Sequence, residues 1–237
     1  YRGYAAISTI ATSLDQNWNA FEASLRHPAG NFVFSFSYTY SHDLGDLSGA
    51  AIDPSNPARF YGSVDGLDFR HSASFTAIYA MPWLRNGNFP ERFLLAGWKV
   101  SGISTLRSGT TLTPGLSISN QGLSARPDRK PNATLEGAKT VKQWFNTAAF
   151  QAPAPGHFGN TGTGILRGPA LLNLDTALYK EFHIRENNFF EFRAEAFNTL
   201  NHTNFSGVNA TFGSSAFGNV TSATDPRVLE LALRYKF

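Results

Sequence analysis

The sequence predicts an all-β protein: an antiparallel meander of about seven transmembrane strands that belongs to a large outer-membrane β-barrel, with one short helix in a long extracellular loop. Charged residues make up only 16% of the chain and aromatic residues 14%, whereas ordinary soluble domains carry about 25% charged residues. No run of about 18 apolar residues occurs, so we expect no transmembrane helix. The apolar residues alternate with polar ones instead, which is typical of strands with one face toward lipid.

The composition also excludes several classes of protein. Cysteine is absent, which excludes a disulfide scaffold, a thiolate metal site and a cysteine nucleophile. The net charge of +3 is mild and the basic residues are scattered, which argues against nucleic-acid binding. The chain has no initial Met and no charged-then-apolar leader, so we expect a processed or truncated piece of a longer protein.

The first four strands are predicted at 18–27, 32–42, 69–80 and 93–106, from residues of alternating character. The opposite face of 32–42 carries mostly hydroxyl groups, which suit a crowded, wet barrel interior better than the surface of a soluble sandwich. The apolar faces carry, in order, Phe21, Ala23 and Leu25; Phe32, Phe34, Phe36, Tyr38 and Tyr40; Ala73, Phe75, Ala77 and Tyr79; and Leu94, Ala96, Trp98 and Val100.

The last three strands are predicted at 171–184, 189–200 and 227–237. Lys180 interrupts the apolar face of the first near one end, where its long side chain can reach the membrane interface. The apolar faces carry Leu172, Leu174, Leu178 and Phe182; Phe190, Phe192, Ala194 and Ala196; and Leu229, Leu231, Leu233, Tyr235 and Phe237. We expect the charged residues of the polar faces to point into the barrel interior, toward water or a plug domain: Glu22, Arg26, Arg70, Lys99, Asp175, Glu191, Arg193, Glu195 and Arg234.

The connections between these strands alternate in length. Segments 28–31, 81–92 and 185–188 are short, and segments 43–68, 107–170 and 201–226 are long. Outer-membrane barrels have short periplasmic turns and long extracellular loops. The alternation therefore predicts that the long loops are extracellular, and the spacing of Val141, Trp144, Phe145 and Phe150 predicts a helix over 138–150 in the longest one.

Seven strands do not close a bacterial barrel, which needs an even number of at least eight. One interpretation is that this chain is the last third of a large barrel. The alternative is that residues from Tyr4 to Thr12, which alternate weakly, supply an eighth strand and close a small barrel. In either case we expect no stable monomer in water, because the sheet exposes an apolar face and free edges.

The sequence offers little evidence of catalysis. Glu191, Arg193 and Glu195 share one strand face, but such interleaved charges are common in barrel interiors, and we expect Arg193 to pair with Asp175 on the neighbouring strand. The six histidines form no helical metal motif, and the Gly-rich segment 156–168 lacks the Lys-Ser/Thr of a phosphate loop. We therefore predict that the protein is not an enzyme and holds no cofactor or metal.

The loop at 43–68 is rich in acidic residues. An acidic rim could attract cations or sugars, so we take five residues as candidates for ligand contact: Asp43, Asp46, Asp53, Asp65 and Asp68.

Several stretches resemble the C-terminal barrel portion of Oar-like TonB-dependent transporters of Acidobacteria, which carry a carboxypeptidase-regulatory-like domain at their N-terminus. The similar stretches are 18–25, 36–41, 143–150, Arg167-Gly168-Pro169 and 192–198. The alternating residues from Leu229 to Phe237 resemble the C-terminal signal that the barrel-assembly machinery reads. The resemblance implies about twenty-two strands, a plug domain, partnership with TonB and with outer-membrane lipid, and TonB-dependent transport or reception of a bulky nutrient, either a carbohydrate, a peptide or a chelate.

Two other functions stay open at this point. A structural or adhesive barrel would present the same surface loops without transport, and a plug and TonB box upstream would argue against it. A secreted β-sandwich that binds glycans would dissolve without detergent.

Overall fold

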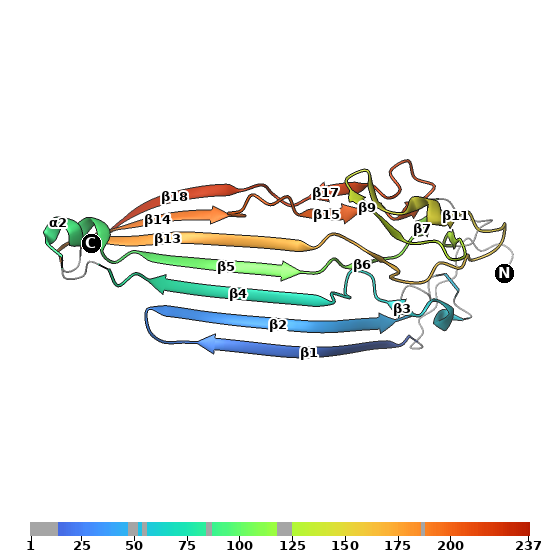
Figure 1. Ribbon diagram of the computed structural model, residues 1–237, viewed down its shortest axis with the longest axis horizontal. Helices are drawn as coiled ribbons and strands as arrows, with labels where there is room; N and C mark the ends of the chain where they lie inside the picture. Colours follow the sequence, from blue (N-terminus) through green and yellow to red (C-terminus); the bar gives the residue numbers. More distant parts are fainter. Residues whose placement is uncertain (1–13, 47–51, 54–55, 84–86, 118–124, 186–187) are drawn as a thin grey trace, which may run out of the picture.

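The computed structural model describes residues 14–46, 52–53, 56–83, 87–117, 125–185 and 188–237. Seven long strands form one antiparallel sheet in which neighbours along the chain are neighbours in space (Figure 1), as the sequence predicted. The sheet order is β1 (Gln16–His27), β2 (Phe32–Gly45), β4 (His71–Ala80), β5 (Lys99–Arg107), β13 (Leu171–Arg185), β14 (Asn188–Phe197) and β18 (Val228–Lys236).

The register of the sheet gathers most of the apolar residues of the seven strands on one face, whereas Val33, Ile78 and Ile103 lie on the other. Phe36 lies opposite Leu25 on β1 and Phe75 on β4. Further along the same face, Leu178 on β13 lies between Val100 on β5 and Ala194 on β14. Ala194 in turn faces Leu231 on β18. Leu231 is 76% exposed. The buried hydrophobic residues among those described all lie outside the long strands, so this sheet has no protein core on its apolar face.

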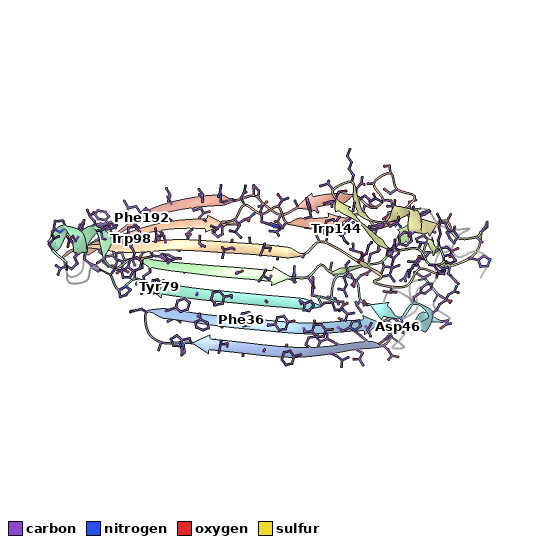
Figure 2. All side chains as sticks on the ribbon, in the orientation of Figure 1. Phe36, Asp46, Tyr79, Trp98, Trp144 and Phe192 are labelled. Atoms are coloured by element: carbon purple, nitrogen blue, oxygen red, sulfur yellow. The ribbon has the colours of Figure 1, made fainter. Side chains whose placement is uncertain are left out.

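The two ends of the sheet differ as the connection lengths predicted. The turns after β1, β4 and β13 lie at one end, and the long connections after β2, β5 and β14 lie at the other (Figure 1). Figure 2 places Tyr79, Trp98 and Phe192 near the short-turn end and Trp144 and Asp46 at the long-loop end. Among the described residues, no helix is long and apolar enough to span a membrane.

The long connections carry short secondary-structure elements of their own. β3 (Gly62–Ser63) extends the main sheet beside β2. The others form two-stranded pairs: β6 (Thr111–Leu112) with β12 (Leu166–Arg167), β7 (Gly115–Leu116) with β16 (Thr211–Phe212), β8 (Asp128–Arg129) with β11 (Phe150–Gln151), β9 (Glu136–Thr140) with β10 (Gln143–Phe145), and β15 (Phe205–Val208) with β17 (Val220–Ala223). Two 3₁₀ turns, η1 (Pro57–Phe60) and η2 (Thr147–Ala149), complete them.

The predicted helix at 138–150 is wrong. β9 and β10 form a hairpin there, followed by η2. The helix prediction placed Val141 on one face with Trp144. In the structure Val141 lies at the tip of the hairpin and is 51% exposed. The side chain of Asn146 accepts a hydrogen bond from the backbone of Ala148 at 3.1 Å, and this local bond favours a turn over a helix.

The predicted strand at 93–106 begins too early. Its first residues belong to α2 (Phe89–Leu95), and β5 starts only at Lys99. Leu94, Ala96 and Trp98 alternate like a strand, but Asn88 and Glu91 form a capping box that starts a helix.

The sheet is open along β1 and β18, which form no pair with each other among the described residues. Because the seven strands alternate in direction, β1 and β18 run the same way. The predicted eighth strand from Tyr4 to Thr12 lies outside the described residues.

Candidate ligand-binding face and loop body

The polar face of the sheet collects small hydroxyl residues in its first strands and charges in its last ones. Ser37 on β2 lies opposite Ser24 and Ser74, and Ser35 lies opposite Arg26 and Thr76. The register places every predicted interior-facing charge on this face except Arg70, which precedes β4. The charges on the face are Glu22, Arg26, Lys99, Asp175, Glu191, Arg193, Glu195 and Arg234.

The charges of β14 are paired within the sheet. Arg193 contacts Glu195 on the same strand at 2.5 Å, and Glu191 accepts a hydrogen bond from Lys236 on β18 at 2.9 Å. The predicted pair of Asp175 with Arg193 is wrong, because Tyr179 lies opposite Arg193. The three charged residues of β14 therefore take part in two ion pairs.

Asp175 serves the end of β14 instead. Its carboxylate accepts hydrogen bonds from the side chain of Asn173 at 3.0 Å and from the backbone of Asn198 at 2.8 Å. Asn198 follows directly after β14 and has a positive φ of 49°. Asp175 therefore fixes the turn by which the chain leaves the sheet for its last long loop.

The three long connections fold together into a structured unit, here called the loop body (residues 46–70, 108–170 and 198–227, as far as they are described). Its core consists of Phe145, Ala149, Phe150 and Leu166. Phe217 from the last connection packs edge-to-face on Phe145, with the ring centroids 5.1 Å apart. The second and third connections thus share a hydrophobic core that the sheet itself lacks.

A buried carboxylate joins two of these connections. Asp68, with no exposed surface, binds Arg167 at 2.6 Å and contacts Arg70 at 3.4 Å. The backbone of Asp43 also donates to it at 3.0 Å. Burial raises the pKa of Asp68, but this hydrogen bond and the two arginines lower it more, so the net pKa is below the ordinary value.

Arg126 is a second buried charged residue that joins two connections, and the sequence alone did not indicate this role. Its guanidinium donates to the carbonyl of Thr161 at 3.2 Å and to the hydroxyl of Thr163 at 2.8 Å, and it stacks on Phe60 at 4.6 Å. Burial lowers the pKa of Arg126 to about 10, and the negative charge of Asp65 opposes this shift. Arg126 therefore stays charged at neutral pH and ties the first long connection to the second.

The five acidic residues predicted to contact a ligand do not form an open rim. Asp43, Asp46, Asp53 and Asp68 are buried, and Asp65 alone is exposed. Asp43 accepts two hydrogen bonds from Gln16, at 2.9 and 2.8 Å, and Asp46 accepts one from the backbone of Asp15 at 2.9 Å. These contacts join the ends of β1 and β2 where the first long connection begins, and a ligand role for the five residues stays a prediction.

The Gly-rich segment 156–168 has a packing role. Gly159 and Gly164 have positive φ angles of 77° and 63°. A Cβ atom at Gly159 would lie 2.1 Å from the carbonyl oxygen of Arg126, and one at Gly164 would lie 2.1 Å from that of Ser63. Only glycine allows the two backbones to approach this closely.

A cleft of about 500 Å³ opens where the loop body meets the polar face. Its acidic groups are Asp175, Asp225 and Glu230, and the amides of Asn173 and Asn198 lie beside them. Phe197, which is 42% exposed, adds an aromatic surface to the wall. This combination of acids, amides and an aromatic ring suits a polar ligand with many hydrogen-bonding groups. The described residues contain no group of His, Cys, Asp and Glu that could hold a metal ion.

The sheet has one apolar and one polar face, with short turns at one end and folded loops at the other. These features are typical of a protein that crosses a membrane with β-strands. A family model described as an outer membrane beta barrel domain matches residues 1–230, and the chain belongs to this family. Its location is the bacterial outer membrane. Comparison with curated proteins and with solved structures found no match to the chain.

Proposed function

We propose that this chain forms part of the barrel wall and the extracellular ligand-binding loops of a TonB-dependent transporter or receptor for a bulky nutrient, either a carbohydrate, a peptide or a chelate. The observation that carries the proposal is the cleft between the loop body and the polar face, lined by Asp175, Asp225 and Glu230. In this arrangement the polar face lines the barrel interior, so a ligand held by the loops lies at the mouth of a polar passage. The chain performs no covalent chemistry.

The free edges of the sheet support a larger barrel. An unpaired backbone group in lipid costs several kcal/mol, so β1 and β18 need further strands beside them. Because these two edges run in the same direction, an odd number of additional strands closes the barrel in an antiparallel manner. The resemblance to Oar-like transporters agrees with a large barrel, and it implies that the plug domain and the TonB contact lie elsewhere in the full protein.

The test uses the full-length protein in the outer membrane. Purified protein is screened by thermal shift against oligosaccharides, peptides and ferric chelates, and the best binder is then measured on Glu230→Gln and Asp225→Asn variants. We expect these variants to weaken binding at least tenfold, whereas Glu22→Gln, on the same face but on β1, keeps it. Uptake that continues unchanged without TonB would contradict the proposal.

The second candidate is a structural or adhesive barrel, and the folded core of the loop body favours it. The ion pair of Arg167 with buried Asp68 and a hydrophobic core hold the loops in one folded arrangement, which adhesion can use without any transport. Deletion of TonB distinguishes the two functions, because adhesion to a surface needs no energy from the inner membrane.

A further inference from the structure

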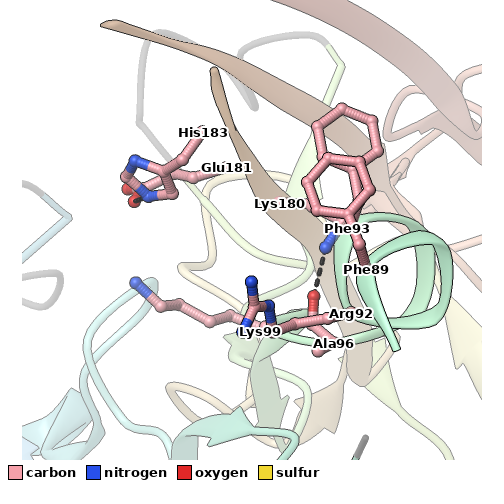
Figure 3. Close-up of a pocket in the computed structure, with 9 residues that line it drawn as sticks. Phe89, Arg92, Phe93, Ala96, Lys99, Lys180, Glu181 and His183 are labelled. Atoms are coloured by element: carbon pink, nitrogen blue, oxygen red, sulfur yellow. Dashed lines mark hydrogen bonds and ion pairs between the residues drawn. The ribbon is translucent and has the colours of Figure 1, made fainter. Parts of the chain in front are cut away.

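The polar side of the sheet has a second recess, at the short-turn end away from the loop body. A cleft of about 440 Å³ lies between α2 and the end of β13, and Arg92 and Lys99 lie along one side of it (Figure 3). A cleft of about 360 Å³ adjoins it and shares Lys99 with it. We call the two clefts together the basic trough. Lys99 lies on the polar face of β5, so the trough opens toward the barrel interior.

The trough carries basic groups that no carboxylate neutralises. Arg92 and Lys99 are exposed and form no ion pair with any residue that the structure describes. Each of the two acidic residues that line the trough already contacts a basic side chain: Glu181 contacts His183, and Glu191 contacts Lys236. The positive charges of Arg92 and Lys99 are therefore available to a ligand.

The cleft beside the loop body has the opposite charge. Its described lining contains no Lys, Arg or His. Asp225 and Glu230 are exposed there and have no ion-pair partner in the described part of the chain, whereas Asp175 is occupied by the turn after β14. The polar face thus holds unpaired carboxylates at one site and unpaired cations at another.

The register of the sheet gives the distance between these two sites. Lys99 lies opposite Tyr179 on β13, Tyr179 lies opposite Arg193 on β14, and Arg193 lies opposite Ala232 on β18. Glu230 is two residues from Ala232, on the side of the loop body. With strands about 4.8 Å apart and residues about 3.3 Å apart along a strand, the Cα atoms of Lys99 and Glu230 are about 16 Å apart. An extended peptide of about five residues spans about 17 Å.

We propose that the ligand of this passage is a short peptide with free ends, whose amino group binds Asp225 and Glu230 and whose carboxylate binds Lys99 and Arg92. This inference rests on the proposed function and narrows its ligand classes to one. Charge-assisted hydrogen bonds of this kind are stronger than those between neutral groups. A neutral oligosaccharide leaves both charged sites unpaired, and an anionic chelate is repelled by the acidic cleft, so both sites favour the peptide.

The test is calorimetric titration of the full-length protein in detergent with pentaalanine, with its N-acetyl and C-amide derivatives and with dialanine. We expect pentaalanine to bind at least tenfold more tightly than either derivative, because each derivative loses one charged end. Dialanine is too short to reach both sites and should bind as weakly as the derivatives. Absence of pentaalanine binding, or equal affinity for pentaalanine and its blocked derivatives, would overturn the proposal.

Two double variants assign each end of the peptide to its site. Asp225→Asn, Glu230→Gln should no longer distinguish pentaalanine from its N-acetyl derivative but should still discriminate against the C-amide. Arg92→Gln, Lys99→Gln should show the reverse, and the control Lys130→Gln, Lys142→Gln, which removes two exposed cations of the loop body, should behave as the wild type does. Each preference is measured within one protein, so a general loss of stability does not produce this pattern. Wild-type preferences in both double variants would show that the assignment is wrong.

A failure of this inference is distinct from a failure of the transport proposal. Uptake of an oligosaccharide or a ferric chelate through TonB, by a protein that does not bind pentaalanine, supports transport and refutes the peptide assignment. Tight binding of pentaalanine with uptake that continues without TonB supports the peptide site and contradicts the transport proposal.

Discussion

Replacing Asp68 tests whether the loop body is held together by its buried charges. In Asp68→Ala the guanidinium of Arg167 loses its 2.6 Å partner and Arg70 loses its 3.4 Å partner. Removing one partner of a buried ion pair costs about 3–5 kcal/mol. Arg167 and Arg70 keep 33% and 29% of their side-chain surface exposed, so water recovers part of that cost, and we expect a loss of about 2–3 kcal/mol in the local stability of the loop body.

Hydrogen exchange on the full-length protein in detergent measures this loss directly. We expect faster exchange in the loop body and at the end of β2, where the amide of Asp43 donates to Asp68. Exchange in the rest of the long strands should be unchanged. The control Asp225→Ala removes an exposed carboxylate at the same end and should leave the exchange unchanged. Equal protection of the loop body in Asp68→Ala and the wild type would refute the reasoning.

The pH dependence of the same experiment follows from the pKa of Asp68, which is lower in the folded protein than in the unfolded chain. The ion pair therefore contributes its full stability above the unfolded pKa of about 3.9 and loses it as the pH falls through the folded pKa. We expect loop-body protection in the wild type to fall in this acidic range, and the contribution to be absent in Asp68→Ala at every pH.

Three further substitutions test other parts of the account. Leu231→Arg places a charge on the lipid side of β18 and should cost about 2–4 kcal/mol in unfolding measured in lipid vesicles. Glu230→Arg, on the opposite face and across from Glu195, should be tolerated; equal costs would contradict the assignment of the faces. Gly159→Ala should destabilise the loop body by more than about 1 kcal/mol, because its Cβ meets the carbonyl of Arg126 and its φ is positive; wild-type resistance to limited proteolysis would show that this approach is not required. Thr163→Val removes an acceptor of buried Arg126 and should cost about 1–3 kcal/mol by hydrogen exchange in the same unit, with Thr134→Val as an exposed control; similar exchange in both variants would argue against a fastening role.

The strands could be predicted because the alternation of apolar and polar residues that marks a strand is visible within the strand's own sequence. Alternation places Phe36 and Ser37 on opposite faces whatever lies beside them, and the antiparallel register then continues each face across the sheet. The error at the start of β5 has the same origin, since Leu94 and Trp98 also alternate. The capping residues Asn88 and Glu91, with Pro90 at the first turn, were the local indication of a helix.

The loop body could not be predicted in the same way. Asp68 and Arg167 are 99 residues apart in the chain, and nothing in the local sequence of either indicates the other. The acidic residues of the first connection resemble a surface rim in the sequence alone, because burial depends on partners such as Gln16 and Arg167 that other segments supply. The Gly-rich segment gives a partial indication, since glycines with close backbone neighbours mark places where chains meet.

The central claim is that the apolar face of the sheet contacts lipid and the polar face contacts water. The most direct test is to measure which side chains of β18 are accessible to water in the membrane. These 237 residues contain no cysteine, so each single cysteine introduced along β18 reports on one position of this sheet. In intact outer membranes, a water-soluble maleimide should label Glu230→Cys, Ala232→Cys and Arg234→Cys and spare Leu229→Cys, Leu231→Cys and Leu233→Cys. Uniform labelling along the strand, or labelling of the leucine positions alone, would show that the apolar face does not contact lipid.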